Sequence, residues 1–391
     1  MGGNSEGGVS RRSFLGAAGL MGAAVGAAAC APSSAPAPAP AAPPSSPAAP
    51  AKAAWEAEWE RLIAAAKQEG KLVVQTTPGD NYVKALRAFE AAFPGITVDH
   101  TGLVAANFAP RLLQERKAGV YSFDVMVSTF GPVGLSLRAE GALGDTRSLM
   151  FRPDVLDNGA WRDGFENGFL DKAKKIAYAT GLERTRWLWV NTDEVKDGEI
   201  KSLEDLVNPK WKGRIIAGDL RVIGTGSNPA TAMRLGAGED IIKRLWKDQE
   251  VVLIREPRQS VEFMVRGKYA IGIGAIYPLS ALDEFKAQGL GNNLKPLDVE
   301  NVDSLNYSEN VILIDRAPHP NATKLFVNWL LTKEGQTIWS KLAQSNSRRA
   351  DVEPTSPNLL PVPGKKYLTF TREETLPEDI KTRELAKKVL D

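Results

Sequence analysis

Hydroxyl and guanidinium side chains recur in this sequence where a predicted strand ends or a predicted helix begins. Arginine binds carboxylate and phosphate groups through two parallel hydrogen bonds, and hydroxyl groups supply further donors. Together these side chains suit a small anion or an organic carboxylate. The candidate binding residues are Thr76, Thr77, Ser128, Thr129, Arg184, Arg221, Thr225 and Tyr277. For any single Ser or Thr in these loops, ordinary turn and capping chemistry is the simpler explanation.

Thr225 lies in the segment Gly224-Thr225-Gly226-Ser227, before a helix that we expect to open at Pro229. A helix N-terminus presents backbone N–H groups without intrahelical partners and the positive end of the helix dipole, which favour an anionic or polar group. The glycine pattern matches neither a dinucleotide-binding fingerprint nor a P-loop. The motif alone therefore has low specificity for any one ligand.

The segment 175–195 is predicted to carry the chain from one lobe to a second. It contains two short runs typical of strands, 176–180 and 187–191, separated by a charged stretch with Arg184 and Arg186. Charges between apolar strands are costly to bury unless they are paired or face a cleft. A chain of 391 residues is expected to form two lobes, so we place both arginines near the cleft. The alternative is an ordinary strand pair joined by a solvated charged turn.

Strands and helices alternate on both sides of this crossing. The predicted strands are 72–75, 96–100 and 123–127 before it, and 214–217, 251–255, 269–276 and 311–314 after it. This alternation is typical of parallel sheets covered by helices, in which the loops at the carboxyl ends of the strands carry the ligand. A long helix is expected from 321 to 342.

The crossing divides the chain into a first and a second lobe. The predicted boundaries are 54–183 and 308–391 for the first lobe and 184–307 for the second. The residues past Asp351 are rich in proline and then in charge, and we expect them to pack loosely around the first lobe.

The first thirty residues are predicted to be a signal peptide. Ser10-Arg11-Arg12-Ser13 is a twin-arginine pattern, and the uncharged run that follows is too short to span a membrane comfortably. Cys30 is the one cysteine of the chain and precedes an Ala/Pro/Ser-rich linker, 31–53. We therefore expect export to the periplasm or the outer face of the cytoplasmic membrane, with a lipid anchor on Cys30. The alternative is ordinary small-residue cleavage, with Cys30 lost.

Charge and motif content exclude several classes of function. With 49 basic and 47 acidic residues, the chain lacks the basic excess of nucleic-acid binders. A secreted enzyme would need a catalytic set, and outside the predicted signal peptide the sequence contains neither a Gly-x-Ser-x-Gly elbow nor a His-Glu-x-x-His motif. His100 and His319 are interpreted as structural. We expect no catalytic residues, no cofactor and no bound metal, and a monomeric chain.

The order of motifs resembles the extracellular solute-binding proteins of ABC importers, in the iron-binding-protein-like branch of family 1. The motifs are Lys-Leu-Val-Val at 71–74, Asn-Pro-Lys-Trp-Lys-Gly-Arg-Ile at 208–215, Ala-Pro-His-Pro-Asn-Ala at 317–322, Leu-Phe-Val-Asn-Trp-Leu at 325–330 and Glu-Gly-Gln at 334–336. The resemblance covers roughly 55–353. It implies an α/β fold of two lobes, the type II periplasmic-binding-protein-like fold. Each lobe would be a mainly parallel sheet flanked by helices, joined to the other by crossing strands. The lobes would close on a small ligand and deliver it to a membrane permease.

The ligand is where this sequence departs from the iron-binding members. Their two adjacent tyrosines correspond here to Ile276 and Tyr277, and their acidic ligand corresponds to Thr129. Ferric ion needs anionic oxygens, and Tyr277 with a candidate at Asp80 is a poor set. We therefore expect an anion or organic carboxylate. Ferric iron is the main alternative, and a neutral sugar stacked on Trp187 or Tyr277 is another. For Trp187, core packing is the simpler expectation.

Overall fold

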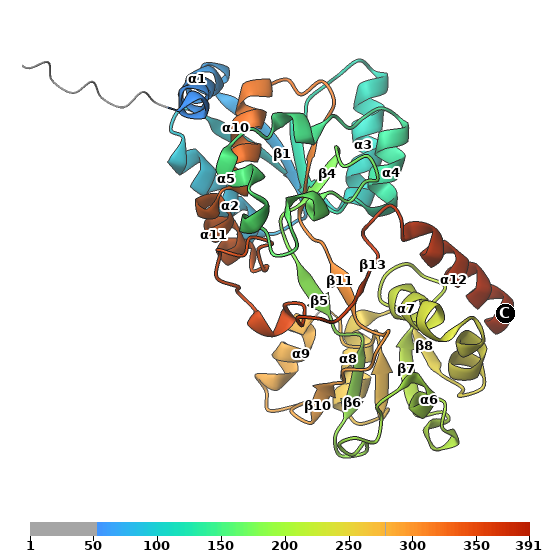
Figure 1. Ribbon diagram of the computed structural model, residues 1–391. Helices are drawn as coiled ribbons and strands as arrows, with labels where there is room; N and C mark the ends of the chain where they lie inside the picture. The colour runs from blue at the N-terminus through green and yellow to red at the C-terminus, as the bar shows by residue number, and fades with distance from the viewer. Residues whose placement is uncertain (1–52, 278) are drawn as a thin grey trace, which may run out of the picture. The chain divides into compact units, whose positions relative to one another are not determined.

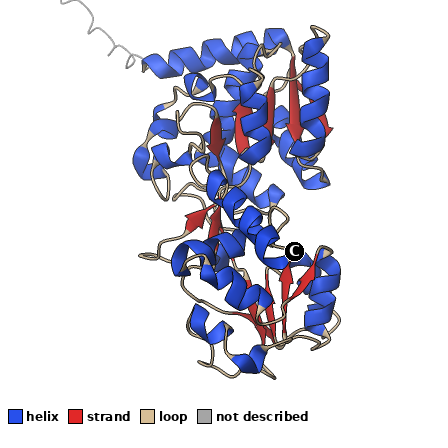
Figure 2. Cartoon of the chain, turned by 90° about the vertical axis from the view of Figure 1, so that its right-hand side faces the viewer, coloured by secondary structure: helices blue, strands red, loops and turns tan. Residues whose placement is uncertain are grey.

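The computed structural model describes residues 53–277 and 279–391 (Figure 1). The predicted signal peptide, Cys30 and all but the last residue of the predicted linker lie outside these residues. The described part of the chain forms two five-stranded sheets and a three-stranded sheet, with helices against the larger two (Figure 2). Within it, no helix combines the length and the apolar character that a membrane crossing requires.

The first sheet has the strand order β2-β1-β3-β12-β4. Its strands are β1 (Lys71–Thr76), β2 (Thr97–Gly102), β3 (Val125–Ser128), β4 (Ala177–Ala179) and β12 (Asn310–Leu313). β1 is parallel to β2 and β3, whereas β12 is antiparallel to β3 and β4. Along β1 the buried side chains alternate, so that Leu72 and Val74 pack in one apolar cluster and Val73 packs in another.

Helices cover both faces of the first sheet. The face of Leu72 and Val74 packs against α1 (Ala54–Glu69), α2 (Asp80–Ala92), α10 (Pro320–Leu331) and α11 (Lys333–Ala343). The face of Val73 packs against α3 (Ala105–Lys117) and α4 (Gly131–Ala139). The helix expected from 321 to 342 is thus two helices. The break is at Thr332, whose Oγ1 accepts a hydrogen bond from Gly335 N at 3.0 Å and caps α11.

The second sheet has the strand order β10-β6-β9-β7-β8. Its strands are β6 (Leu188–Asn191), β7 (Ile215–Gly218), β8 (Val252–Ile254), β9 (Ile271–Ile273) and β10 (Leu294–Pro296). β7, β8 and β9 are parallel, and β6 runs antiparallel to β9 and β10. One face packs against α6 (Leu203–Leu206), α7 (Ser227–Ala237) and the π-helical turn η5 (Ile242–Lys247). The other face packs against α8 (Pro257–Val265) and α9 (Leu279–Lys286).

Two strands of the three-stranded sheet carry the chain between the larger sheets (Figure 1). β5 (Glu183–Thr185) follows β4 and precedes β6, and it pairs antiparallel with β11 (Ser304–Asn306), which precedes β12. The third strand, β13 (Leu368–Thr369), is parallel to β11. The sequence indicated a charged stretch between two strands around Arg184. In the structure, part of this stretch is itself a strand, β5. The remaining short elements are α5 (Pro153–Leu156) and the 3₁₀ turns η1 (Thr146–Leu149), η2 (Asn158–Ala160), η3 (Phe165–Gly168), η4 (Pro209–Trp211) and η6 (Pro357–Leu359).

The C-terminal segment corrects the expectation that 308–391 packs only in the first lobe. Glu373 binds Arg138 of α4 through two hydrogen bonds of 2.8 Å, which ties the segment to the first sheet. α12 (Leu376–Leu390) then packs on α7 and η5, where Ala386 is buried in the core of the second sheet. Arg234 of α7 pairs with Glu378 at 2.5 Å. The many charges of α12 lie around a narrow apolar stripe, which explains why the sequence alone indicated loose packing.

Candidate ligand-binding site

A cavity of about 330 Å³ lies at the carboxyl ends of β7, β8 and β9, against β5 and β11. Carboxyl ends of parallel strands are the usual location of ligands in α/β sheets. The residues that line the cavity are Thr185, Trp187, Val222, Ile223, Gly224, Thr225, Asn228, Arg255, Tyr277, Ser304, Leu305, Asn306, Phe370 and Thr371. These side chains offer neutral hydroxyl and amide groups, aromatic rings and one guanidinium group. Of the predicted residues, Thr225 and Tyr277 are among them.

The N-terminus of α7 forms one wall of the cavity because three glycines allow very close backbone contacts. Gly274 follows β9 with φ of +63°, and a Cβ there would collide with the carbonyl oxygen of Thr225. A Cβ at Gly226 would likewise collide with the carbonyl of Asp219, and Gly218 packs against the backbone of Gly226. Gly224 and Thr225 before α7 and Asn228 of its first turn therefore line the cavity, so the positive end of the α7 dipole lies against it. Of the first-turn N–H groups, that of Asn228 donates to the carbonyl oxygen of Gly224 at 3.0 Å, and Pro229 has none.

Two arginines share one buried carboxylate beside this helix terminus. Asp219 accepts hydrogen bonds from Arg221 Nε and from Arg255 Nε, both at 2.9 Å. Burial alone would raise the pKa of Asp219, but these hydrogen bonds outweigh it and hold that pKa below its ordinary value. Arg221 also binds Asp391 at 2.5 Å and does not line the cavity. Arg255 does line it, with 67% of its side chain exposed, and is the guanidinium group available there.

The sequence analysis did not single out Arg255. Its position in the sequence could have indicated a binding role, because Arg255 directly follows β8. Ligands usually lie at the carboxyl ends of parallel strands, and β8 is such a strand.

Aromatic rings form a second wall. The rings of Trp187 and Tyr277 lie 5.8 Å apart at an angle of 39°. Trp187 is buried and donates from Nε1 to Ser304 Oγ at 2.8 Å. It therefore packs in the core, as expected, and also forms part of the cavity wall. Tyr277 remains 42% exposed. Desolvation of the phenolate, with a contribution from the Glu183 carboxylate, raises the pKa of Tyr277, so its hydroxyl is a neutral donor.

The structure places Arg184 on the opposite side of the crossing strands, outside this cavity. Its guanidinium group is buried and pairs with Asp298 at 3.2 Å and with Asp303 at 3.8 Å. Burial raises the pKa of Asp303 to about 6, opposed by the charges of Arg186 and Arg184. Arg186 pairs with the same carboxylate at 3.1 Å. Both arginines are therefore held in an ion-pair network.

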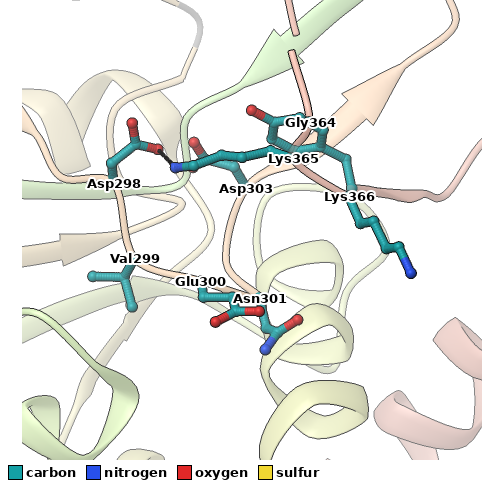
Figure 3. Close-up of a pocket in the computed structure, with 9 residues that line it drawn as sticks. Asp298, Val299, Glu300, Asn301, Asp303, Gly364, Lys365 and Lys366 are labelled. Atoms are coloured by element: carbon teal, nitrogen blue, oxygen red, sulfur yellow. Dashed lines mark ion pairs between the residues drawn. The ribbon is translucent and has the colours of Figure 1, made fainter. Parts of the chain in front are cut away.

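That network borders a second cavity, of about 440 Å³, between the loop 298–303 and residues 364–367 (Figure 3). Asp298 and Asp303 form part of its wall, and Lys365 pairs with Asp298 at 3.1 Å, as the dashed line in Figure 3 marks. The loop 298–303 contributes the carboxylates Asp298, Glu300 and Asp303 to the wall, and the facing segment contributes Lys365 and Lys366. Asp298 and Asp303 are already paired with Lys365, Arg184 and Arg186.

The predicted residues of the first lobe lie at the carboxyl ends of β1 and β3, and the 330 Å³ cavity does not include them. Thr76 is buried and its Oγ1 lies 2.8 Å from His100 Nε2. Ser128 is buried beside Asn310, its partner in register. The other predicted residues of this edge are Thr77, which is half-buried, and Asp80 and Thr129, which are exposed.

Next to this edge lies a fully buried carboxylate that the sequence analysis missed. Glu309, directly before β12, accepts hydrogen bonds from Trp339 Nε1 at 2.6 Å, Ser345 Oγ at 3.0 Å and Tyr82 Oη at 3.1 Å. Burial raises the pKa of Glu309 to about 7 despite these donors. Glu183 of β5 adds to this effect through its charge.

Glu309 is expected to make stability fall as pH rises. Its pKa is higher in the folded protein, about 7 against an ordinary 4.5, so the folded state binds more protons between these values. The free energy of unfolding should therefore decrease by about 3 kcal/mol as pH rises through this range. Glu309→Gln should abolish most of this slope, because its amide can still accept from Trp339 and Ser345 and donate to Tyr82. Urea unfolding at several pH values measures the slope, and an unchanged slope in the variant would contradict this assignment.

Within the described residues, no cluster of three or more His, Cys, Asp or Glu side chains has a geometry that could hold a metal ion.

Comparisons with known proteins identify the family of this chain and proteins with a similar fold. Residues 71–342 match the family model described as bacterial extracellular solute-binding protein. A search of curated proteins gives no match. The chain is similar in structure to FutA of Trichodesmium, solved with iron and citrate, with 14% identity, a TM-score of 0.62 and coverage of 82% of this chain and 99% of that one.

Two further solved structures are similar. Ferric iron-binding protein A of Mannheimia haemolytica, in an open conformation, has 15% identity and a TM-score of 0.61, covering 82% of this chain and 98% of that one. AfuA of Actinobacillus pleuropneumoniae, with fructose-6-phosphate bound, has 20% identity and a TM-score of 0.52, covering 81% and 97%. The predicted fold, two α/β lobes joined by crossing strands, is confirmed by these likenesses.

Proposed function

Because the chain belongs to the bacterial extracellular solute-binding protein family, we propose that it captures a small organic anion in the 330 Å³ cavity and delivers it to the membrane permease of an ABC importer. The observation that carries the proposed ligand class is the convergence of Arg255 and the N-terminus of α7 on that cavity. Both features attract negative charge, and both belong to one rigid edge of the second sheet.

The organic part of the ligand is inferred from the rest of the wall. Trp187 and Tyr277 offer ring faces, and Thr185, Asn228 and Asn306 offer hydroxyl and amide groups. Such a mixture suits a polar body with one anionic group, such as a phosphorylated or carboxylated small molecule. AfuA, solved with fructose-6-phosphate, is a structural relative that binds a compound of this class.

Ferric ion is not favoured as the ligand, although two structural relatives are described as iron proteins. A hard trivalent cation requires several anionic oxygens. Among the described residues that line the cavity, Tyr277 supplies the one phenol and none supplies a carboxylate. The neighbouring Ile276 is buried in the core of the second sheet, where a paired phenol would have to be. The geometry favours binding and transport, with no catalytic role.

Lobe closure is proposed as the binding motion. The loops after β1 and β3 face the ligand from the first lobe in this account, and rotation about β5 and β11 would bring Thr77, Asp80 and Thr129 to it. Capture between two lobes excludes water from the ligand and gives the permease a closed form to recognise. A monomer is sufficient for this function.

Export and anchoring are proposed from the sequence. The twin arginines at 11–12, the lone Cys30 and the spacer after it suit a protein exported folded and held at the membrane surface by a lipid on Cys30. Cys30→Ala is expected to release the protein into the soluble periplasmic fraction. Cell fractionation measures this, and a variant that remains as membrane-bound as the native chain would contradict the anchor.

A thermal-shift screen of the purified protein tests the proposed ligand class. Ligands that bind only the folded state raise its stability, by about 2.7 kcal/mol at one hundred times the dissociation constant. The screen should contain fructose 6-phosphate, citrate and inorganic phosphate, with fructose, spermidine and ferric nitrilotriacetate for comparison. We expect stabilisation by at least one organic anion. Stabilisation by fructose, spermidine or the ferric complex alone would contradict the proposal.

A further inference from the structure

The crossing strands place a carboxylate on the same face as the cavity. In the β5–β11 ladder, Glu183 lies opposite Asn306, and Thr185 lies opposite Ser304. Side chains two apart along a strand share a face, as do directly opposed residues. Thr185, Ser304 and Asn306 line the cavity, and the Glu183 side chain leaves the ladder on the same side as theirs. Glu183 is not itself a lining residue, and Leu305, opposite Arg184, also lines the cavity, so Glu183 is placed beside the cavity wall, next to Asn306. Arg184 lies on the other face.

Glu183 is a carboxylate without a cationic partner. Its Oε1 accepts a hydrogen bond from the backbone N–H of Asn346 at 3.1 Å. In the part of the chain that the structure describes, no lysine, arginine or histidine forms an ion pair with it, whereas Arg184 and Arg186 bind Asp303 on the opposite face. The side chain is half-buried. A partly desolvated carboxylate of this kind is costly unless an opposite charge is supplied.

The groups around Glu183 increase this demand for positive charge. Glu309 is a second carboxyl group. Burial raises the pKa values of Tyr82, Tyr277 and Glu309, and the negative charge of Glu183 adds to each of these shifts. These residues come from the first lobe, the crossing and the second lobe. Tyr277 lines the cavity itself, so the acidic region is continuous with the cavity wall. Burial also raises the pKa of Glu183.

We propose that the ligand is zwitterionic: its anionic group binds Arg255 and the N-terminus of α7, and its ammonium group binds Glu183. This inference rests on the proposed function and makes the ligand class more specific. The cavity has a positive edge, contributed by the second sheet, and the Glu183 carboxylate of the crossing strands lies beside its wall. Charge of one sign at each end orients the ligand and rejects analogues that lack either group, because such analogues leave one buried charge unpaired. Glu183 is thus the residue that distinguishes an amino-substituted anion from its hydroxyl analogue.

Matched pairs of probes test this on the purified protein by calorimetric titration. Glucosamine 6-phosphate and glucose 6-phosphate differ only in an amine against a hydroxyl. Phosphoethanolamine and ethyl phosphate form a smaller pair that differs by the terminal amine. We expect the amine member of at least one pair to bind about tenfold more tightly, as hydrogen bonds between charged groups typically give.

Glu183→Gln should remove this preference without weakening the amine-free member, because the neutral glutamine neither pairs with the ammonium group nor leaves a charge unpaired when the amine-free member binds. The glutamine oxygen can still accept from Asn346, and Glu284→Gln, on α9 outside the cavity, is the control that should retain the preference. Equal affinities within both pairs, or a preference that survives Glu183→Gln, would overturn the zwitterion and leave the anionic ligand standing. Failure of all four probes and of the anion screen would overturn the anionic ligand and this inference together. The comparison of probes on the native chain needs no variant, so a poorly folding Glu183→Gln would not remove the test.

Discussion

Arg184→Ala is expected to lower the free energy of unfolding by about 3 kcal/mol or more, because it breaks a buried ion-pair network. Arg184 is 6% exposed and pairs with Asp298 and Asp303. Its removal leaves Asp303, which is itself 7% exposed, with Arg186 as its remaining cation. Urea unfolding followed by tryptophan fluorescence measures the effect.

A second substitution separates the lost ion pair from lost packing. Asp303→Asn removes the carboxylate that Arg184 and Arg186 share and keeps the oxygen that accepts from Trp187 N at 3.2 Å. The double variant Arg184→Ala/Asp303→Asn should therefore lose less stability than the sum of the two single variants, because the Arg184–Asp303 pair is lost only once. A loss below about 0.5 kcal/mol in Arg184→Ala, the usual range for surface substitutions, would show instead a solvated residue.

Arg255→Ala is expected to weaken binding of the organic anion by about tenfold to a hundredfold, as loss of a hydrogen-bonded charge typically does. The stability of the free protein should change little, since the Arg255 side chain is two-thirds exposed and exposed ion pairs contribute weakly. Calorimetric titration of the anion identified by the thermal-shift screen measures the affinity.

Arg258→Ala is the matched control for Arg255→Ala. The Arg258 side chain is also 67% exposed and also forms an ion pair, with Glu284 at 2.5 Å, but it does not line the cavity. Its replacement should leave the affinity unchanged. Equal losses in the two variants would mean that general surface charge attracts the anion, and would remove Arg255 from the site.

Much of the fold follows from local pattern. The alternation of apolar runs and helical segments before Lys175 predicted β1, β2 and β3, because β1 and β3 are buried on both faces, β2 buries Val98, and each helix carries one apolar stripe. The length of the chain and the strands around 176–191 predicted that it crosses between two sheets, and β4 and β6 lie in different sheets.

The binding residues were harder to predict because they depend on register. Arg184 and Glu183 are neighbours, and a single position decides which side chain faces the cavity. The sequence shows that this stretch is charged, but it does not show which side chains face the cavity. That depends on the pairing of β5 with β11, which lies more than a hundred residues away in the chain. The contribution of Phe370 and Thr371 to the cavity depends on β13, a two-residue strand without a recognisable pattern.

A crystal structure of the purified protein with its stabilising organic anion tests the central claim most directly. We expect the anionic group within hydrogen-bonding distance of the Arg255 guanidinium and at the N-terminus of α7, with the body of the ligand against Trp187 and Tyr277. An anion bound instead in the 440 Å³ cavity beside Lys365, or elsewhere on the surface with the 330 Å³ cavity unchanged, would contradict the account.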